Sequence, residues 1–303
     1  MRILLIIFLM VNGVKLSYSQ TDFDGLFMDR NYLCVGLVGS YSSFTHYWEG
    51  EHKRDNLNMG TVSNISLGVT GNYGLSDRLN FIFNLPYVQT KASAGNMQGQ
   101  NGVQDLSLWL KYALIQKKLF KGDLQIIPAL GYSMPTRYYT PDLLPLSIGM
   151  QSRVWSYRMM VDYEKNHWYF TGAATYMHRQ NIFLDRNTYY TDRQIYSNEV
   201  IMPDVWLWNA RFGYRNQDFI ADVFYENMNT IGGFDIARNA MPFPSNNMDY
   251  QRLGIYLKYE TPVNGLSILA NGFTTIAGRN MGQWLGIGLG AFYIIDMTKK
   301  HGL

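Results

Sequence analysis

The chain has 303 residues and a net charge of +3, and only 16% of its side chains are charged whereas 15% are aromatic, with 23 tyrosines. Typical soluble proteins carry about 25% charged residues, so the composition is unusual for a cytosolic enzyme, and it is too apolar for a disordered chain. In the absence of a basic tract we expect no nucleic-acid partner, and past the first residues no apolar run approaches the roughly 18 residues of a membrane-spanning helix.

The N-terminus has the features of an export signal. Arg2 supplies a positive charge, residues 3–14 form an apolar core, and Ser17 and Ser19 are small residues at the positions that a signal peptidase reads. We therefore predict a signal peptide over residues 1–19 that is removed on export. The single cysteine, Cys34, lies too far beyond the apolar core to be a lipid attachment site, and we expect it to pack within a strand.

Six segments alternate apolar residues with polar or small ones, which is the period of a strand with one apolar face. The clearest segment runs over residues 64–73, and each of the six ends in a tyrosine that shares the apolar phase. The other five segments span residues 106–112, 155–163, 206–214, 253–259 and 285–293.

Strands of the opposite direction are expected between these six, near residues 32–47, 79–88, 124–134, 168–177, 219–228 and 266–276. The connections after the tyrosine-ended strands are short, and residues 114–122 form the longest of them. The connections after the other strands are long, as at residues 179–203, with the exception of residues 277–280. This alternation is typical of bacterial outer-membrane barrels, in which short turns face the periplasm and longer loops face outward.

We therefore predict an all-β fold, a single transmembrane antiparallel up-and-down β-barrel of about 12 strands over residues 32–295. An even number of strands places both termini in the periplasm and lets the first strand pair with the last, so that no sheet edge is left open in lipid. Residues 20–31 and 296–303 are then short periplasmic segments. The strand-ending tyrosines are expected to form a periplasmic aromatic girdle of Tyr73, Tyr112, Tyr163, Tyr214, Tyr259 and Tyr293.

Two neighbouring segments carry a resemblance to a known family. Residues 68–88 contain a Tyr-Gly turn with Asp-Arg and then a strand ending in proline, and residues 102–114 form a Gly-x-x-Asp strand with Lys-Tyr. Together they resemble the outer-membrane proteins of the meta-pathway phenol-degradation family, which implies a barrel that carries small, often aromatic or apolar, compounds. Gln104 and Trp109 stand where that family usually has glycine. The matching residues are Tyr73, Gly74, Asp77, Arg78, Pro86, Gly102, Asp105, Lys111 and Tyr112.

Strand alternation also predicts which residues face the lumen. A barrel of about 12 strands encloses a narrow path, so the size of a solute would be the first filter. Inward-facing charges of both signs are expected either to pair with one another or to contact the solute. If residues 215–218 form a tight turn, Arg211 lies directly opposite Asp222. The predicted pore-lining residues are Asp105, Trp109, Lys111, Arg158, Arg211, Asp222, Glu226, Arg252 and Lys258.

The long connection over residues 135–150 is unusually apolar for a segment that faces water. We predict that it folds over or into the barrel mouth and constricts it, and packing against neighbouring loops is the alternative. The constriction would be formed by Leu143, Leu144, Leu146 and Ile148.

These features favour a porin-like outer-membrane channel or transporter of a Gram-negative cell for passive passage of a small solute, apolar and aromatic compounds included. The alternatives are a non-conducting structural or surface-interaction barrel and an outer-membrane hydrolase. We assign no catalytic residue, because none of the five histidines is followed two positions later by the serine that some barrel hydrolases use. We also assign no metal or cofactor. The expected partners are outer-membrane lipid, the solute and the barrel-assembly machinery.

Overall fold

The structure is a computed structural model that describes residues 23–238 and 240–298. The signal peptide predicted for residues 1–19 lies outside the described residues. Every element in the described part is a strand, and twelve long strands form one sheet. They are β1 (Tyr32–Phe44), β4 (Val62–Ser76), β5 (Leu79–Ala92), β7 (Asp105–Tyr112), β9 (Gly122–Pro135), β10 (Val154–Lys165), β11 (Trp168–Arg179), β16 (Asp204–Arg215), β17 (Phe219–Ile231), β18 (Asp249–Glu260), β19 (Leu266–Arg279) and β20 (Leu285–Asp296).

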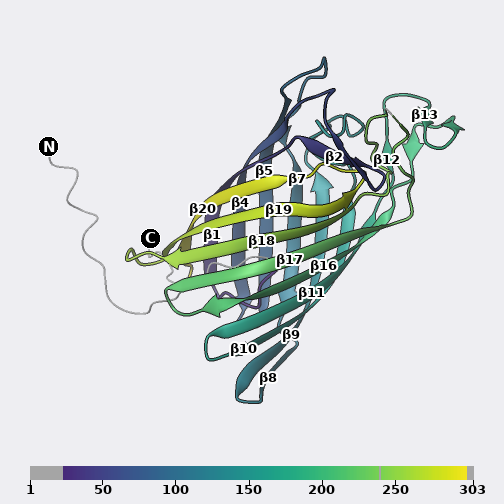
Figure 1. Ribbon diagram of the computed structural model, residues 1–303. Coiled ribbons are helices and arrows are strands. Elements are labelled where there is room, and N and C mark those ends of the chain that lie inside the picture. The colour runs from purple at the N-terminus through teal and green to yellow at the C-terminus, as the bar shows by residue number, and fades with distance from the viewer. Residues whose placement is uncertain (1–22, 239, 299–303) are drawn as a thin grey trace, which may run out of the picture.

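The sheet closes on itself. Each long strand pairs antiparallel with the long strands before and after it, and β1 pairs with β20 from Tyr32 opposite Asp296 to Ser43 opposite Leu285. Closure satisfies both edges of every long strand, which is the requirement for a sheet that crosses lipid. Figure 1 shows the resulting barrel from the side. The predicted all-β, 12-stranded, up-and-down barrel is confirmed.

Side chains on the outer surface of the barrel are apolar. Leu37, Leu67, Ile255, Ile287 and Leu289 are all exposed, although such residues are normally buried in a soluble protein. They alternate along their strands with inward-facing residues, because successive side chains in a strand point to opposite faces. An apolar band of this extent is costly in water and favourable in lipid, so the wall is built to span a membrane.

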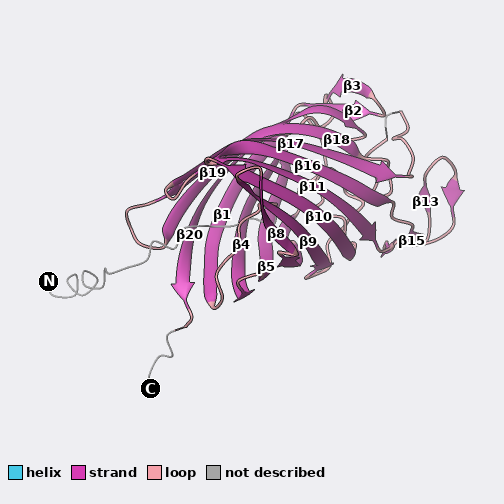
Figure 2. Ribbon diagram, turned by 90° about the horizontal axis from the view of Figure 1, so that it is seen from below, coloured by secondary structure: helices cyan, strands magenta, loops and turns pink. Residues whose placement is uncertain are grey.

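The two ends of the barrel differ in their connections. Short turns join β4 to β5, β10 to β11, β16 to β17 and β18 to β19, and the pairing of Tyr32 with Asp296 places the start of β1 and the end of β20 at this same end. We call it the short-turn end and the opposite one the long-loop end; Figure 2 shows them at opposite sides of the molecule. The long-loop end carries β2 (His46–Glu49), β3 (His52–Asp55), β6 (Asn101–Val103), β12 (Ile182–Phe183), β13 (Tyr189–Tyr190), β14 (Gln194–Ile195) and β15 (Glu199–Val200).

The connection expected over residues 114–122 contains an additional strand. β8 (Ile115–Leu119) forms a hairpin with the first part of β9, and Phe120 and Lys121 make the turn with φ of 47° and 63°. In a two-residue turn, positive φ at both residues matches the right-handed twist of the two strands that the turn joins. The hairpin extends the wall beyond the short-turn end, as Figure 1 shows.

Candidate functional site

The lumen holds the charged residues predicted to line it. Lys111, Arg158, Arg211, Asp222 and Lys258 are buried within the barrel although their strands have exposed apolar residues in the alternate positions. Asp105, Trp109, Glu226 and Arg252 share the same inward phase. All nine predicted residues therefore lie on the inner wall, and their contact with a passing solute stays a prediction.

Arg211 and Asp222 form a buried two-point ion pair. Arg211 Nε lies 3.1 Å from Asp222 Oδ1 and Arg211 Nη2 lies 3.1 Å from Asp222 Oδ2. The hydroxyl of Tyr169 donates a hydrogen bond of 2.5 Å to the same carboxylate. A planar guanidinium matches a carboxylate in this way, and the extra donor satisfies a further lone pair.

The predicted register of these two strands is wrong. Arg211 lies opposite Phe224, and Asp222 lies opposite Gly213. β16 continues to Arg215, which pairs with Ile220, so the turn begins later than expected. Asn216 holds that turn by accepting hydrogen bonds from the backbone N–H groups of Asp218 and Phe219. The ion pair forms across the diagonal because an arginine side chain is long enough to reach it.

Several other lumen charges form ion pairs as well. Arg215 binds Asp162, with 2.6 Å between Nη2 and Oδ1, and also binds Glu164. Lys258 pairs with Glu260, and Arg252 Nη1 lies 3.7 Å from Glu226 Oε1. Sequence reasoning missed Asp162 and Arg215. Asp162 shares the inward phase of Arg158, so the alternation could have identified it, whereas Arg215 was assigned to a turn. Pairing of this kind lets a narrow barrel hold many charges at a tolerable desolvation cost.

The segment before β1 enters the barrel. Lys111 Nζ donates to the carbonyl oxygens of Asp24 at 3.0 Å and Leu26 at 2.7 Å, and it lies 3.2 Å from Asp24 Oδ1. The guanidinium of Arg158 lies between the ring of Phe23, at 3.6 Å, and the ring of Trp109, at 4.0 Å. The described part of the predicted segment 20–31 thus crosses the lumen near the short-turn end.

Packing of this segment leaves little free space. A Cβ on Gly25 would lie 2.2 Å from Asp162 Cγ, so a side chain at this position would displace the segment or the ion pair beside it. Met28 belongs to a buried cluster with Tyr169, Ile220 and other inward-facing residues from several strands. The segment is therefore fitted to the inner wall on more than one side.

Residues that carry the family resemblance hold this segment in place. The carbonyl oxygen of Gly74 accepts a hydrogen bond of 2.8 Å from the backbone N–H of Asn31, and Asp77 Oδ1 accepts one of 3.2 Å from the N–H of Arg30. Tyr73 donates to Asn31 Oδ1 at 3.3 Å. Together with Lys111 of β7, these residues of β4 and of the turn after it bind one stretch of chain.

The predicted constriction loop lies in the opposite mouth. Leu146 is fully buried against Phe44 and Val62, and Ile148 is buried against Val88, all of them inward-facing residues at the long-loop end. Leu143 packs against the Leu146 cluster, and Leu144 is half-buried. The loop therefore folds into the mouth; whether it limits passage stays a prediction.

A hydrogen-bonded pair ties this loop to the wall. The Tyr139 hydroxyl donates to Asp105 Oδ1 at 2.7 Å and accepts from the backbone N–H of Gln151 at 2.8 Å. Burial, with Asp105 nearby, raises the pKa of Tyr139 above its usual value. The hydroxyl therefore stays neutral, and remains a donor, throughout the physiological range.

The six strand-ending tyrosines were predicted to form an aromatic girdle. They share the outward phase and stand close to the short-turn end, and Tyr112, Tyr259 and Tyr293 are exposed. Their role at a membrane border stays a prediction.

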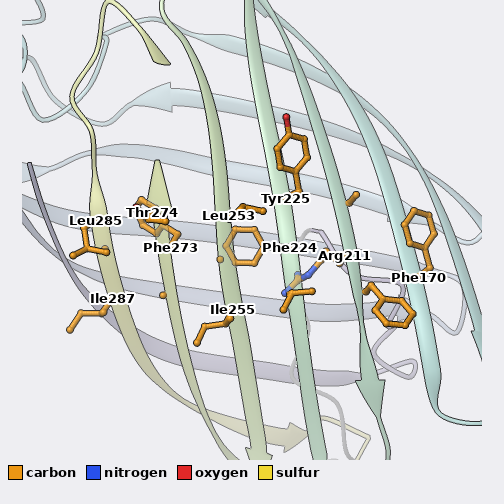
Figure 3. A pocket seen from close by; sticks show the side chains of 16 residues that line it. Phe170, Arg211, Phe224, Tyr225, Leu253, Ile255, Phe273, Thr274, Leu285 and Ile287 are labelled. Atoms are coloured by element: carbon orange, nitrogen blue, oxygen red, sulfur yellow. The ribbon is translucent and has the colours of Figure 1, made fainter. Parts of the chain in front are cut away.

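A groove of about 630 Å³ lies on the outer surface of the wall. Figure 3 shows apolar side chains of several strands along it, among them Leu253 and Ile255 of β18 and Leu285 and Ile287 of β20. Since these residues face lipid, the groove lies outside the barrel lumen and is not part of the path for a solute.

Two side chains of metal-ligand type in the β2–β3 hairpin, His46 and Glu49, are paired with other groups. His46 Nε2 lies 3.0 Å from Asp55 Oδ1, and Glu49 binds Arg54. Thr45 Oγ1 lies 3.0 Å from His46 Nδ1, so a hydroxyl, an imidazole and a carboxylate are in contact, but in an exposed hairpin outside the lumen. Within the described ranges no group of three or more His, Cys, Asp and Glu residues is arranged to hold a metal ion.

Comparison with solved structures finds the same architecture elsewhere. An outer-membrane channel from Pseudomonas putida F1 matches with a TM-score of 0.68 at 13% identity, over 92% of this chain and 100% of that one. The NanC porin matches with a TM-score of 0.50 at 10% identity, over 86% of this chain and 98% of that one. No family model and no curated relative matches the sequence. In the described part of the chain, no helix is long and apolar enough to cross a membrane. These similarities establish the fold, a closed β-barrel of the kind found in outer-membrane channels.

Proposed function

We propose that the protein is a channel in the outer membrane of a Gram-negative cell, for passive passage of a small solute. The observation that carries this proposal is a closed barrel with an apolar exterior and an inner wall rich in polar and paired charged groups. A wall with these two faces suits lipid on one side and a hydrated path on the other. In this arrangement the short-turn end and both termini face the periplasm, and the wall contacts outer-membrane lipid after insertion by the barrel-assembly machinery.

The path is restricted at both ends. Residues 23–28 cross the lumen near the short-turn end, and Leu146 and Ile148 fill part of the mouth at the long-loop end. Barrels of this strand number are narrow even when empty. The channel therefore selects first by size.

The resemblance in residues 68–88 and 102–114 supports apolar or aromatic compounds as candidate solutes. The solved P. putida F1 structure is described as an outer-membrane channel, which supports the same class of function for this chain. We expect no catalytic activity.

A non-conducting barrel is the second candidate, and the same obstructions favour it. Liposome swelling distinguishes the two, because a conducting barrel admits small uncharged solutes such as urea and glycerol at rates that fall with solute size. The channel proposal predicts measurable entry that increases when residues 23–28 are deleted. Correctly folded barrels that admit no solute, with or without the segment, would support a structural or surface-interaction role.

A further inference from the structure

The inner wall is divided into a charged part and a neutral part. The lumen charges described above lie on β7, β10, β16, β17 and β18. In the middle of the barrel, the inward-facing positions of β19, β20, β1, β4 and β5 carry no charged residue within the described strands. Their polar groups are uncharged hydroxyls and amides, among them those of Ser40, Ser66, Thr70, Asn84 and Asn271.

A cavity of about 240 Å³ lies against this neutral part. Val38, Ile82, Leu269 and Phe292 give it an apolar surface, while Thr70, Asn84, Ser107 and Asn271 supply polar groups. An apolar cavity of about 150 Å³ holds a molecule of the size of benzene. The lumen cavity can therefore hold a single substituted ring or a compact aliphatic molecule of similar size.

The two asparagines are positioned for a ligand. Neither the Asn84 nor the Asn271 side chain makes a hydrogen bond to any described residue, and Asn84 is exposed to the lumen. Each amide lies over a glycine of the neighbouring strand. A Cβ added to Gly68 would lie 3.2 Å from Asn84 Oδ1, and a Cβ added to Gly288 would lie 2.4 Å from Asn271 Oδ1. Glycine at these positions makes room for the amides along the wall.

The remaining polar groups of the cavity are partly satisfied by the wall. Thr70 Oγ1 donates to the carbonyl oxygen of Phe83 at 3.1 Å, and Trp109 Nε1 donates to Ser107 Oγ at 3.1 Å. The Ser107 hydroxyl proton remains available to an acceptor. The cavity can thus offer amide donors, amide acceptors and the Ser107 hydroxyl donor to a bound molecule.

An ion would find no charge partner among the side chains that line the cavity. Moving a charged group out of water without a counter-charge costs much more than burying a neutral polar group that gains hydrogen bonds. Of the lumen charges nearby, Arg211 is paired with Asp222, and the Arg158 guanidinium is held between the rings of Phe23 and Trp109 and donates to Thr175 Oγ1. An uncharged ligand loses little hydration free energy when it enters the cavity, and it gains contacts with Val38, Leu269 and Phe292.

From these observations we infer that this cavity is a binding site for an uncharged molecule with a ring-sized apolar body and a hydrogen-bonding group that pairs with Asn84 and Asn271. This inference rests on the proposed channel, in which the cavity would be a station along the solute path. It adds selection by charge to selection by size.

Three probes of nearly equal shape test the inference: benzamide, benzoate and benzamidinium are neutral, negative and positive. Calorimetric titration of the purified full chain in detergent, corrected with empty micelles, should show binding of benzamide that is at least tenfold tighter than binding of either ion. The double variant Asn84→Leu/Asn271→Leu should weaken benzamide binding at least tenfold. Asn64→Leu, which changes an inward-facing amide outside the cavity, should leave it unchanged.

Equal binding of either ion, no binding of benzamide, or wild-type affinity in the double variant would overturn the inference. The shift of the folded barrel in an unheated SDS gel reports folding, and the single variants Asn84→Ala and Asn271→Ala replace the double variant if it does not fold. Liposome swelling is measured in parallel. Benzamide binding without solute entry would contradict the channel but not the site, whereas solute entry without charge discrimination would contradict the site alone.

Discussion

Lys111 Nζ lies 2.7 Å from the carbonyl oxygen of Leu26 and 3.0 Å from that of Asp24, and its side chain is almost completely buried. One lysine of the barrel wall thus gathers oxygen atoms from a segment some 85 residues earlier in the chain. An ammonium group in this position needs these acceptors to offset the loss of water. The relationship links the short sequence motif around Lys111 to the obstruction of the lumen.

Replacing Lys111 by methionine should release the N-terminal segment. The change removes three contacts and leaves the Asp24 carboxylate without this partner, which we expect to weaken docking by about 3 kcal/mol, or roughly a hundredfold in the docking equilibrium. Trypsin should then cleave the chain at Arg30 faster than in the wild type. Lys117→Met, at an exposed lysine of the β8 hairpin, is the matched control. Equal cleavage of both variants would show that Lys111 does not hold the segment.

Asp222→Asn should make the lumen more favourable to anions. It leaves the buried Arg211 guanidinium without its carboxylate while keeping the size of the side chain. Breaking a buried pair in this way costs about 3–5 kcal/mol, so the midpoint of thermal unfolding should also fall. The reversal potential in a salt gradient reports the selectivity. An unchanged potential in a folded variant would mean that ions do not pass this pair.

Shortening the loop in the mouth should increase conductance. Deleting residues 143–146 removes Leu146 from its contacts with Phe44 and Val62 and opens the space that it fills. We expect a rise of severalfold in single-channel conductance. Deleting residues 191–193, the connection between β13 and β14, is the control because that hairpin extends away from the mouth in Figure 1. Unchanged conductance after the first deletion would show that another part of the path is limiting.

The contact between Asp235 and Arg279 should persist on mild acidification. Hydrogen bonds from Arg279, 2.7 Å from each carboxylate oxygen, lower the pKa of Asp235 below its ordinary value. A group with a lowered pKa contributes stability above its unfolded-state pKa and loses it as the pH falls through the folded-state pKa. Protease cleavage within residues 232–248 should therefore stay constant from pH 7 to about 4 and increase only below that range. In Arg279→Gln the increase should begin at higher pH; an identical profile would exclude this contact as the cause.

Much of the barrel could be predicted because the alternation of side chains along a strand is a pattern of neighbouring residues. The alternation in residues 64–73 gave both the strand and its outward face, and the tyrosines located the strand ends. Register is less local: the turn that Asn216 holds begins one residue later than predicted, which places Arg211 opposite Phe224 and not opposite Asp222. The alternation of apolar and polar residues does not indicate where such a turn begins.

The lumen was predicted less completely, for a related reason. Charged residues in the inward phase are easily recognised in a sequence. Asn84 and Asn271 can be identified as candidate binding residues only from the structure, which places Gly68 and Gly288 beside them on neighbouring strands. The segment over residues 23–28 has no strand period at all. Its position depends on contacts with Lys111, Arg158 and Asp162, which lie far away in the chain.

Single-channel conductance in a planar bilayer tests the central claim most directly, with the wild type compared with a variant that lacks residues 23–28. A narrow channel obstructed by its N-terminal segment should give small but discrete current steps in the wild type, and steps several times larger in the variant. A barrel that is folded and inserted in both cases, yet passes no current in either, would contradict the account.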